Sequence, residues 1–183
     1  MTLAIIPARI GSKRIKEKNI KFFFGKPVIY YSIKAAKQCG LFSKIIVTTD
    51  SLKVSKIAKK YGAEVFLRSK KLSNDSTMLS PVLYDLLKKK EYSNENYVCC
   101  LYATAPLINY QDLKRSFLKM KKSKIKSCHS VTEFDFPVSR SLNFSNSLIS
   151  FKYKKFRDTP SQKTPRIVHD AGQFFWLEIN SFL

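Results

Sequence analysis

Short apolar runs alternate with longer amphipathic stretches along most of the chain. Leu3–Pro7 (LAIIP) is apolar at every position, as expected of a strand that is covered on both faces. Tyr97–Tyr102 (YVCCLY) has the same character. The pattern predicts strands over Leu3–Pro7, Lys44–Thr48, Ala63–Leu67, Tyr97–Tyr102, Ser127–Thr132 and Phe174–Ile179.

The stretches between these runs carry helix signals. Pro27 lies in the first turn of one predicted helix, and Gly40 follows the end of that helix. Ser51 is a suitable capping residue for the next helix, which Gly62 ends. The predicted helices are Pro27–Cys39, a segment from Ser51 to Tyr61, Thr77–Lys90, and a segment that opens at Asn109 or Tyr110.

Strands that alternate with helices of about 10–14 residues indicate a Rossmann-like, doubly wound α/β fold, with a mostly parallel sheet and helices on both faces. The pattern changes after Glu133. Phe134–Pro165 is rich in Ser, Asn, Lys and aromatic residues, with strand-like pieces at Ser147–Tyr153. No repeat and no linker marks a boundary, so we predict a single domain over residues 1–183.

The net charge of +21 is compatible with nucleic acid, an anionic membrane or an anionic small substrate. However, 27 of the 34 basic residues are lysines, and they are scattered over the whole chain. The tightest cluster, Lys119–Lys126, has no interleaved aromatic residues on which bases could stack. We therefore expect no nucleic-acid partner.

The apolar segments also bear on the compartment. No run reaches the roughly 18 apolar residues of a membrane span, so no membrane partner is expected. Met1–Pro7 is apolar but lacks the basic leader and the cleavage site of a signal peptide. The four cysteines show no metal-like spacing and are interpreted as reduced, mostly buried side chains. These features predict a cytoplasmic protein.

The basic loop, residues 8–19, follows the first predicted strand at the sheet edge where doubly wound folds bind ligands. A glycine allows backbone N–H groups to approach phosphate oxygens, a serine adds a hydroxyl donor, and cations neutralise charge. The loop contains these types as Arg9, Gly11, Ser12, Lys13, Arg14, Lys16 and Lys18. It matches neither the Walker nor the GxGxxG pattern. A solvated basic loop is the alternative, and the residue types favour phosphate binding.

The segment IIPARIGSKRIKEKNIKFFFGKPVIYYSI resembles the opening motif of the sugar-activating cytidylyltransferases, a family that includes the sialic, pseudaminic and 3-deoxy-manno-octulosonate enzymes. The resemblance implies a sheet of the nucleotide-diphospho-sugar transferase type and a loop that wraps the triphosphate of CTP. It assigns nucleotide binding to Ala8, Arg9, Gly11, Ser12, Lys13, Lys18 and Asn19. The chain departs from the family motif at Ile10, which replaces a glycine, and at Lys16, where a proline is usual.

Two further stretches extend the resemblance. IVTTD, ending at Asp50, resembles the family's IVSTD; Asp50 is a cap, a metal ligand or a structural hydrogen-bond acceptor, and we favour the last. The segment from Gly62 to Thr77 resembles the part of the family that reads cytosine and ribose. It implies nucleotide contacts for Arg68, Asp75 and Ser76, with Thr77 as a further candidate. A polar loop that caps the next helix is the alternative.

The later motifs resemble the pseudaminic acid branch of this family. They are YATAP at Tyr102–Pro106, SVTEF followed by Phe136-Pro137, and HDAGQFFW at His169–Trp176. The resemblance implies transfer of CMP from CTP to the anomeric hydroxyl of pseudaminic acid, with sialic or legionaminic acid as alternatives. It places the acidic nine-carbon sugar near Thr104, Arg140 and Gln173, with Arg140 meeting the carboxylate.

In this class the sugar hydroxyl attacks the α-phosphorus and pyrophosphate leaves. The resemblance implies Mg²⁺ as cofactor, with Asp170 as first and Glu178 as second candidate ligand. An ordinary surface Glu on the last strand is the alternative for Glu178. Arg9 and Lys13 would stabilise developing charge, and Asp170 or His169 would accept the hydroxyl proton.

The family also implies a homodimer. Its members continue beyond the position of Leu183, so we expect a chain truncated relative to them. An inactive relative that acts as a basic polyanion-binding module is the alternative from another class.

Overall fold

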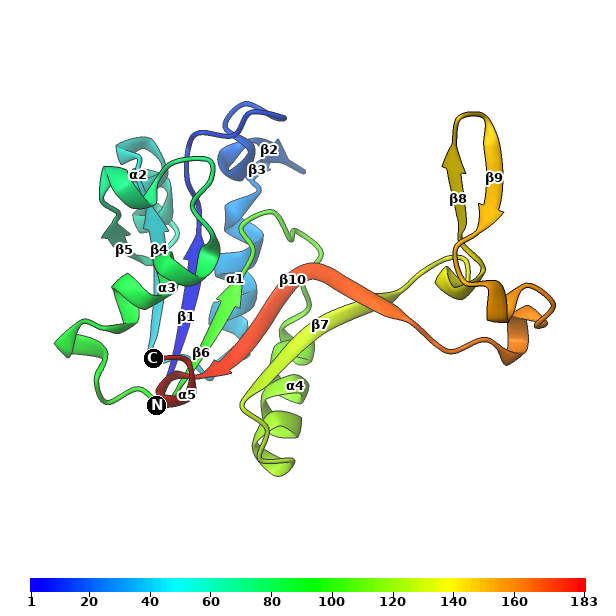
Figure 1. Cartoon of the computed structure of the whole chain (residues 1–183). Helices are drawn as coiled ribbons and strands as arrows, with labels where there is room; N and C mark the ends of the chain where they lie inside the picture. The colour runs from blue at the N-terminus through cyan, green and yellow to red at the C-terminus, as the bar shows by residue number, and fades with distance from the viewer. The chain divides into compact units, whose positions relative to one another are not determined.

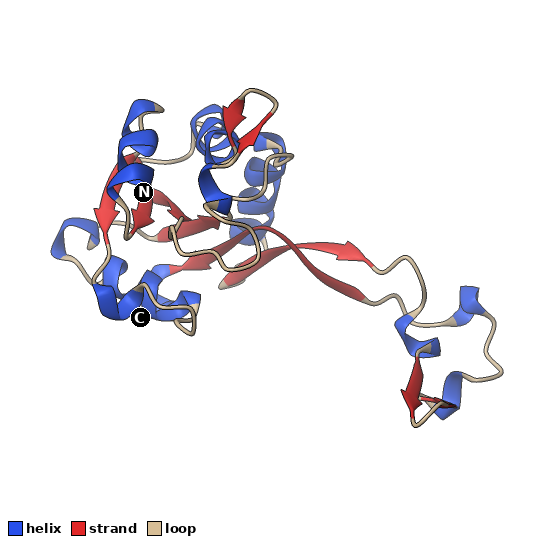
Figure 2. Ribbon diagram, turned by 90° about the horizontal axis from the view of Figure 1, so that it is seen from above, coloured by secondary structure: helices blue, strands red, loops and turns tan.

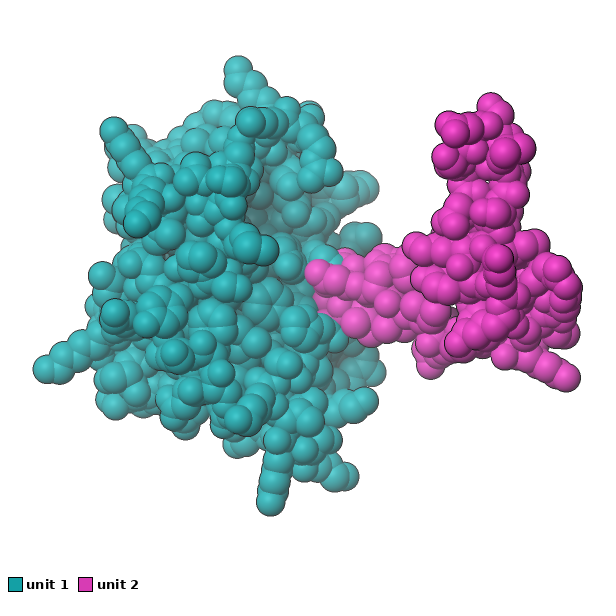
Figure 3. All heavy atoms as spheres, viewed as in Figure 1, with its two compact units in different colours: residues 1–129, 172–183 teal, residues 130–171 magenta.

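The computed structural model describes all residues, 1–183, and they form two compact units (Figure 3). Unit 1 comprises residues 1–129 and 172–183, and unit 2 comprises residues 130–171. The change in residue pattern after Glu133 falls close to the start of unit 2. The prediction of a single domain stays a prediction.

A six-stranded sheet with the order β5-β4-β1-β6-β10-β7 forms the centre of unit 1 (Figure 1). β1 pairs in parallel with β4 and β6, and β4 pairs in parallel with β5, whereas β10 runs antiparallel to β6. β10 and β7 lie side by side (Figure 2). The strands are β1 (Thr2–Pro7), β4 (Lys44–Thr49), β5 (Glu64–Leu67), β6 (Tyr97–Leu101), β7 (Ser127–Glu133) and β10 (Val168–Glu178). The mostly parallel sheet predicted from the alternating pattern is confirmed.

Helices cover both faces of this sheet, which explains why β1 is apolar at every position from Leu3 to Pro7. Ala4 and Ile6 of β1 pack in one core cluster with α1, α2 and α4, whereas Leu3 and Ile5 pack in a second cluster with α3 and α5. All four side chains are fully buried. The helices are α1 (Ile29–Cys39), α2 (Leu52–Lys60), α3 (Leu79–Leu87), α4 (Tyr110–Lys122) and α5 (Ile179–Phe182). No helix combines the length and the apolar character that crossing a bilayer requires.

The predicted capping residues of α1 and α2 are found at the ends of these helices. The Ser51 hydroxyl accepts a hydrogen bond from the backbone N–H of Val54 and caps α2. Gly40 adopts a φ of 66° and ends α1 in the left-handed conformation that glycine favours. α3 begins at Leu79 instead of Thr77, and the residue that precedes it, Met78, is extended.

Short elements complete both units. Those of unit 1 are η1 (Lys18–Ile20), the hairpin strands β2 (Phe22–Phe23) and β3 (Lys26–Pro27), η2 (Lys70–Leu72) and η3 (Lys90–Tyr92). Those of unit 2 are η4 (Val138–Arg140), β8 (Leu142–Ser145), β9 (Leu148–Phe151), η5 (Lys154–Phe156) and η6 (Ser161–Lys163). β8 and β9 form an antiparallel hairpin whose turn residues, Asn146 and Ser147, both have positive φ.

Candidate active site

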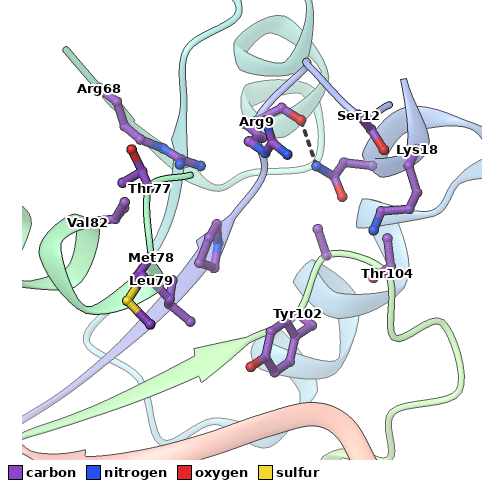
Figure 4. Close-up of a pocket in the computed structure, with 13 residues that line it drawn as sticks. Arg9, Ser12, Lys18, Arg68, Thr77, Met78, Leu79, Val82, Tyr102 and Thr104 are labelled. Atoms are coloured by element: carbon purple, nitrogen blue, oxygen red, sulfur yellow. Dashed lines mark hydrogen bonds between the residues drawn. The ribbon is translucent and has the colours of Figure 1, made fainter. Parts of the chain in front are cut away.

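A cleft of about 230 Å³ opens at the carboxyl edge of the sheet in unit 1 (Figure 4). Pro7 ends β1, Arg68 follows β5 and Tyr102 follows β6, so three strands deliver residues to it. Parallel strands that end at one edge bring together segments far apart in sequence. The lining residues are Pro7, Arg9, Ser12, Lys18, Asn19, Arg68, Thr77, Met78, Leu79, Val82, Tyr102, Ala103 and Thr104.

The basic loop forms one wall of the cleft and is tied to the sheet through its backbone. The N–H of Ala8 donates to the carbonyl oxygen of Thr48 at 2.9 Å, and the N–H of Ile10 donates to Asp50 Oδ1 at 2.9 Å. Asn19 Nδ2 donates to the carbonyl oxygen of Arg9 at 2.8 Å, the contact drawn as a dashed line in Figure 4. These bonds fix the loop while the side chains of Arg9, Ser12 and Lys18 line the cleft.

Two cations of the loop pair with Asp75, which lies 66 residues after Arg9 in sequence. Lys13 Nζ lies 2.7 Å from Asp75 Oδ2, and Arg9 Nη1 bonds Oδ1 of the same carboxylate. Lys13 and Arg9 together hold the pKa of Asp75 below its ordinary value. A carboxylate therefore meets the same two cations that would neutralise a phosphate.

Arg68 lines the cleft from the segment after β5 and is half-buried. Its Nη2 donates to the carbonyl oxygen of Thr48 at 2.8 Å, and its backbone N–H donates to that of Thr49 at 2.8 Å. Burial lowers the pKa of the guanidinium, the charge of Asp50 opposes that shift, and Arg9 adds to it. Arg68 Nε is buried without a partner, so the guanidinium keeps an unused donor.

The segment after β6 supplies a third group of lining residues, Tyr102, Ala103 and Thr104. Tyr102 is held by its backbone, which accepts a hydrogen bond from Ser32 Oγ at 2.8 Å and donates to the Gln173 carbonyl oxygen at 2.9 Å. Thr104, a predicted sugar contact, faces the cleft from this segment, close to Lys18 in Figure 4. Gln173 is half-buried on β10 and does not line the cleft.

Six of the lining residues were not selected from the sequence: Pro7, Met78, Leu79, Val82, Tyr102 and Ala103. Tyr102 and Ala103 belong to the YATAP motif, of which only Thr104 is predicted from the sequence as a contact. Met78, Leu79 and Val82 precede or begin α3, where the apolar character reads as ordinary packing against the sheet. The order of elements was the signal that could have identified these three residues, because the start of a helix that follows a parallel strand lies near the carboxyl edge of the sheet.

Some predicted residues do not line the cleft. Ala8 is fully buried, and its N–H is used by the sheet. Gly11 is exposed on the loop, and Ser76 is exposed with its hydroxyl donating to Asn74 Oδ1 at 2.9 Å.

Glu178, the second metal candidate, lies at the opposite edge of the sheet from the cleft. β10 runs antiparallel to β6, and Glu178 pairs with Tyr97, the first residue of β6. The length of β6, about 16 Å at 3.3 Å per residue, therefore separates it from the cleft. Its Oε2 accepts a hydrogen bond from Ser181. This position does not support Glu178 as a ligand of a metal in the cleft.

The remaining candidates belong to unit 2. His169 Nδ1 lies 2.9 Å from the carbonyl oxygen of Asp170, and the His169 ring lies 4.6 Å from that of Phe134. Arg140 lines a cavity of about 840 Å³ within unit 2, together with Phe134 and Phe136. A cation beside aromatic rings suits an anionic ligand that also carries apolar groups.

The carboxylates allow a test of the expected Mg²⁺ ion. No three His, Cys, Asp or Glu side chains gather in the chain, so there is no protein cage for a metal. Near the cleft, Asp75 is paired with two cations and Asp50 accepts from the loop backbone. Mg²⁺ in nucleotide sites uses one or two carboxylates together with phosphates and waters. Both carboxylates near the cleft are therefore already engaged, and a metal bound there would take most of its ligands from the phosphates and from water.

Comparisons with known proteins agree with this geometry. The family model for cytidylyltransferases matches residues 3–163. The chain is 40% identical to the pseudaminic acid cytidylyltransferase of Campylobacter jejuni, over 96% of its own length and 80% of that protein. It is 34% identical to the CMP-N,N'-diacetyllegionaminic acid synthase of Legionella pneumophila, over 85% of its own length and 68% of that protein.

The fold has a counterpart among solved structures. A CMP:2-keto-3-deoxy-manno-octonic acid synthetase complexed with CTP superposes with a TM-score of 0.76. The alignment covers 99% of this chain and 75% of that one at 16% sequence identity, and at that identity it bears on the fold alone. The predicted nucleotide-diphospho-sugar transferase type of fold is confirmed. With the family model spanning most of its length, this chain belongs to the cytidylyltransferase family.

Proposed function

We propose that this chain transfers CMP from CTP to the anomeric hydroxyl of pseudaminic acid and releases pyrophosphate. The observation that carries the proposal is the cleft itself, to which the basic loop contributes Arg9, Ser12 and Lys18 and the segment after β5 contributes Arg68. The 40% identity to the pseudaminic acid enzyme over nearly the whole chain supports the choice of sugar.

The proposed reaction forms one bond and breaks one. The anomeric oxygen of the sugar bonds to the α-phosphorus of CTP, and the bond from that phosphorus to the bridging β-oxygen breaks. The attacking and leaving oxygens must lie in line, and the departing pyrophosphate must be neutralised. Arg9, Lys13 and Lys18 are the cations that would bind the phosphates, with Ser12 as a hydroxyl donor.

Arg68 is the proposed reader of the base. Cytosine presents acceptors at O2 and N3, and a guanidinium donates hydrogen bonds in a fixed fork. The unused buried Nε and the half-buried position of Arg68 support this role. Asp75 and Ser76 lie in the same segment between β5 and α3, and they stay candidate contacts of the ribose.

Asp170 is the proposed protein ligand for Mg²⁺, and this assignment rests on the family resemblance. When bound, the ion would supply positive charge to the phosphate oxygens. Asp170 or His169 is proposed to take the proton of the sugar hydroxyl. Arg140, Thr104 and Gln173 stay the proposed sugar contacts.

A homodimer in the cytoplasm, where CTP is made, completes the proposal. Sedimentation equilibrium tests the dimer: a mass near twice 21.1 kDa is expected, and a monomer at all concentrations would contradict it.

The sugar is tested by incubating the protein with CTP, Mg²⁺ and pseudaminic, legionaminic or sialic acid in turn, and identifying CMP-sugar by mass. We expect the highest kcat/KM with pseudaminic acid. A higher kcat/KM with legionaminic or sialic acid would reassign the substrate within the family. Binding of any polyanion without product would instead favour the inactive module.

A further inference from the structure

We infer that Asp50 is a positioning residue of the nucleotide site, which holds the basic loop and the Arg68 guanidinium in the arrangement that binds CTP. The inference rests on the proposed function, because it concerns the same cleft. Asp50 does not line the cleft, and its role is to act through Ile10 and Arg68.

The contact with the loop is direct. Asp50 follows the end of β4, the strand beside β1, and its Oδ1 accepts from the N–H of Ile10 at 2.9 Å. Immediately after, the N–H of Ser12 donates to the carbonyl oxygen of Ile10 at 2.9 Å, which closes a tight turn around Gly11. Asp50 thus fixes the start of the turn that presents Ser12 to the cleft, with Arg9 just before it.

The contact with Arg68 is electrostatic. Two guanidinium groups, those of Arg9 and Arg68, face the same cleft, and each disfavours the charge of the other. The carboxylate of Asp50 is the neighbouring charge that opposes this repulsion. Arg68 Nη2 and its backbone N–H are fixed on the last carbonyl groups of β4, so Asp50 and Arg68 share one strand end.

The other two roles considered for Asp50 do not fit. The cap of α2 is Ser51, whose hydroxyl accepts from Val54. A metal ligand needs a free oxygen facing the phosphates, whereas Asp50 lies outside the lining residues and is engaged with the loop backbone.

The test separates the two contacts with two variants. Asp50→Asn keeps an oxygen that accepts from Ile10 but removes the charge, whereas Asp50→Ala removes both. Calorimetry measures two probes, inorganic pyrophosphate for the loop and CMP for the loop and base together. In Asp50→Ala we expect the Kd of both probes to rise at least about tenfold. In Asp50→Asn we expect pyrophosphate to bind within about threefold of wild type while CMP weakens by about fivefold or more.

Ser51→Ala is the matched control, because it removes the neighbouring cap and should lower Tm while leaving both Kd values unchanged. Equal Kd values in wild type and Asp50→Ala would overturn the inference while the proposed function stands. Loss of pyrophosphate binding in Asp50→Asn equal to that in Asp50→Ala would overturn the assignment of the loop contact. Wild-type protein that binds neither probe would instead overturn the proposed function.

Discussion

Lys13 Nζ lies 2.7 Å from Asp75 Oδ2, and the other oxygen of that carboxylate is bonded by Arg9. The two loop cations that we propose bind phosphate are therefore paired with a protein anion in the structure. All three side chains are partly or largely exposed, so the pair is accessible to a competing polyanion. Binding of a triphosphate has to replace or share these contacts.

Asp75→Asn is expected to tighten the binding of inorganic pyrophosphate, because the amide no longer competes for Arg9 and Lys13. A decrease of about threefold in Kd is the expected scale for an exposed ion pair. Calorimetry at low salt measures it. Asp112→Asn, which breaks a comparable exposed pair with Arg115 on α4, is the control and should leave Kd unchanged. Weaker pyrophosphate binding in Asp75→Asn would show that Asp75 supports the anion site.

The pairing also has a pH dependence of known sign. Lys13 and Arg9 lower the pKa of Asp75, so the ion pairs are present above the ordinary pKa of Asp, about 3.9, and are lost as the pH falls through the lower folded value. Carboxyl-detected NMR should give a midpoint below about 3.9, and Lys13→Met should raise it. A midpoint at or above the ordinary value would contradict the pairing.

Arg68→Lys keeps the charge but removes the guanidinium fork that reaches Thr48 and that we propose reads the base. We expect the Kd of CMP to rise by about tenfold or more, with pyrophosphate binding within about twofold of wild type. Calorimetry with the two ligands measures the split. Arg115→Lys on the surface of α4 is the control. A parallel loss of both ligands would assign Arg68 to the phosphates instead of the base.

The cysteines should differ in reactivity. Burial raises the pKa of Cys99, Cys100 and Cys39, whereas Cys128 is only half-buried. A thiol reagent applied to the native protein should therefore label Cys128 first, and Cys128→Ser should remove that phase. Rapid labelling of all four thiols in the native state would contradict the packing of the core.

The sequence predicted the features that local pattern controls. Runs such as Leu3–Pro7 are apolar at every position because both faces of β1 are covered, so the parallel sheet was readable. The position of the basic loop at the cleft was predictable because the loop comes directly after β1. The position of Arg68 was predictable from the motif that follows β5. Each of these depends on residues that are close in sequence.

The features that the sequence did not predict depend on the direction of a strand and on contacts between residues far apart in sequence. An apolar run does not tell which way a strand runs, and because β10 is antiparallel to β6, Glu178 lies at the edge away from the cleft. The partners of Arg9 and Lys13 also escaped prediction, because Asp75 reaches them across 66 positions of sequence from Arg9. Met78 and Val82 lie in the predicted helix Thr77–Lys90, and only the three-dimensional arrangement shows that this segment lines the cleft.

The central claim is that the cleft between the basic loop and Arg68 binds CTP for nucleotidyl transfer. Pyrophosphate release measures it most directly, with pseudaminic acid and Mg²⁺ present and CTP, UTP, ATP or GTP supplied in turn. The account predicts release with CTP, at a rate far above that with the other three nucleotides. Release with ATP or GTP and none with CTP would contradict it.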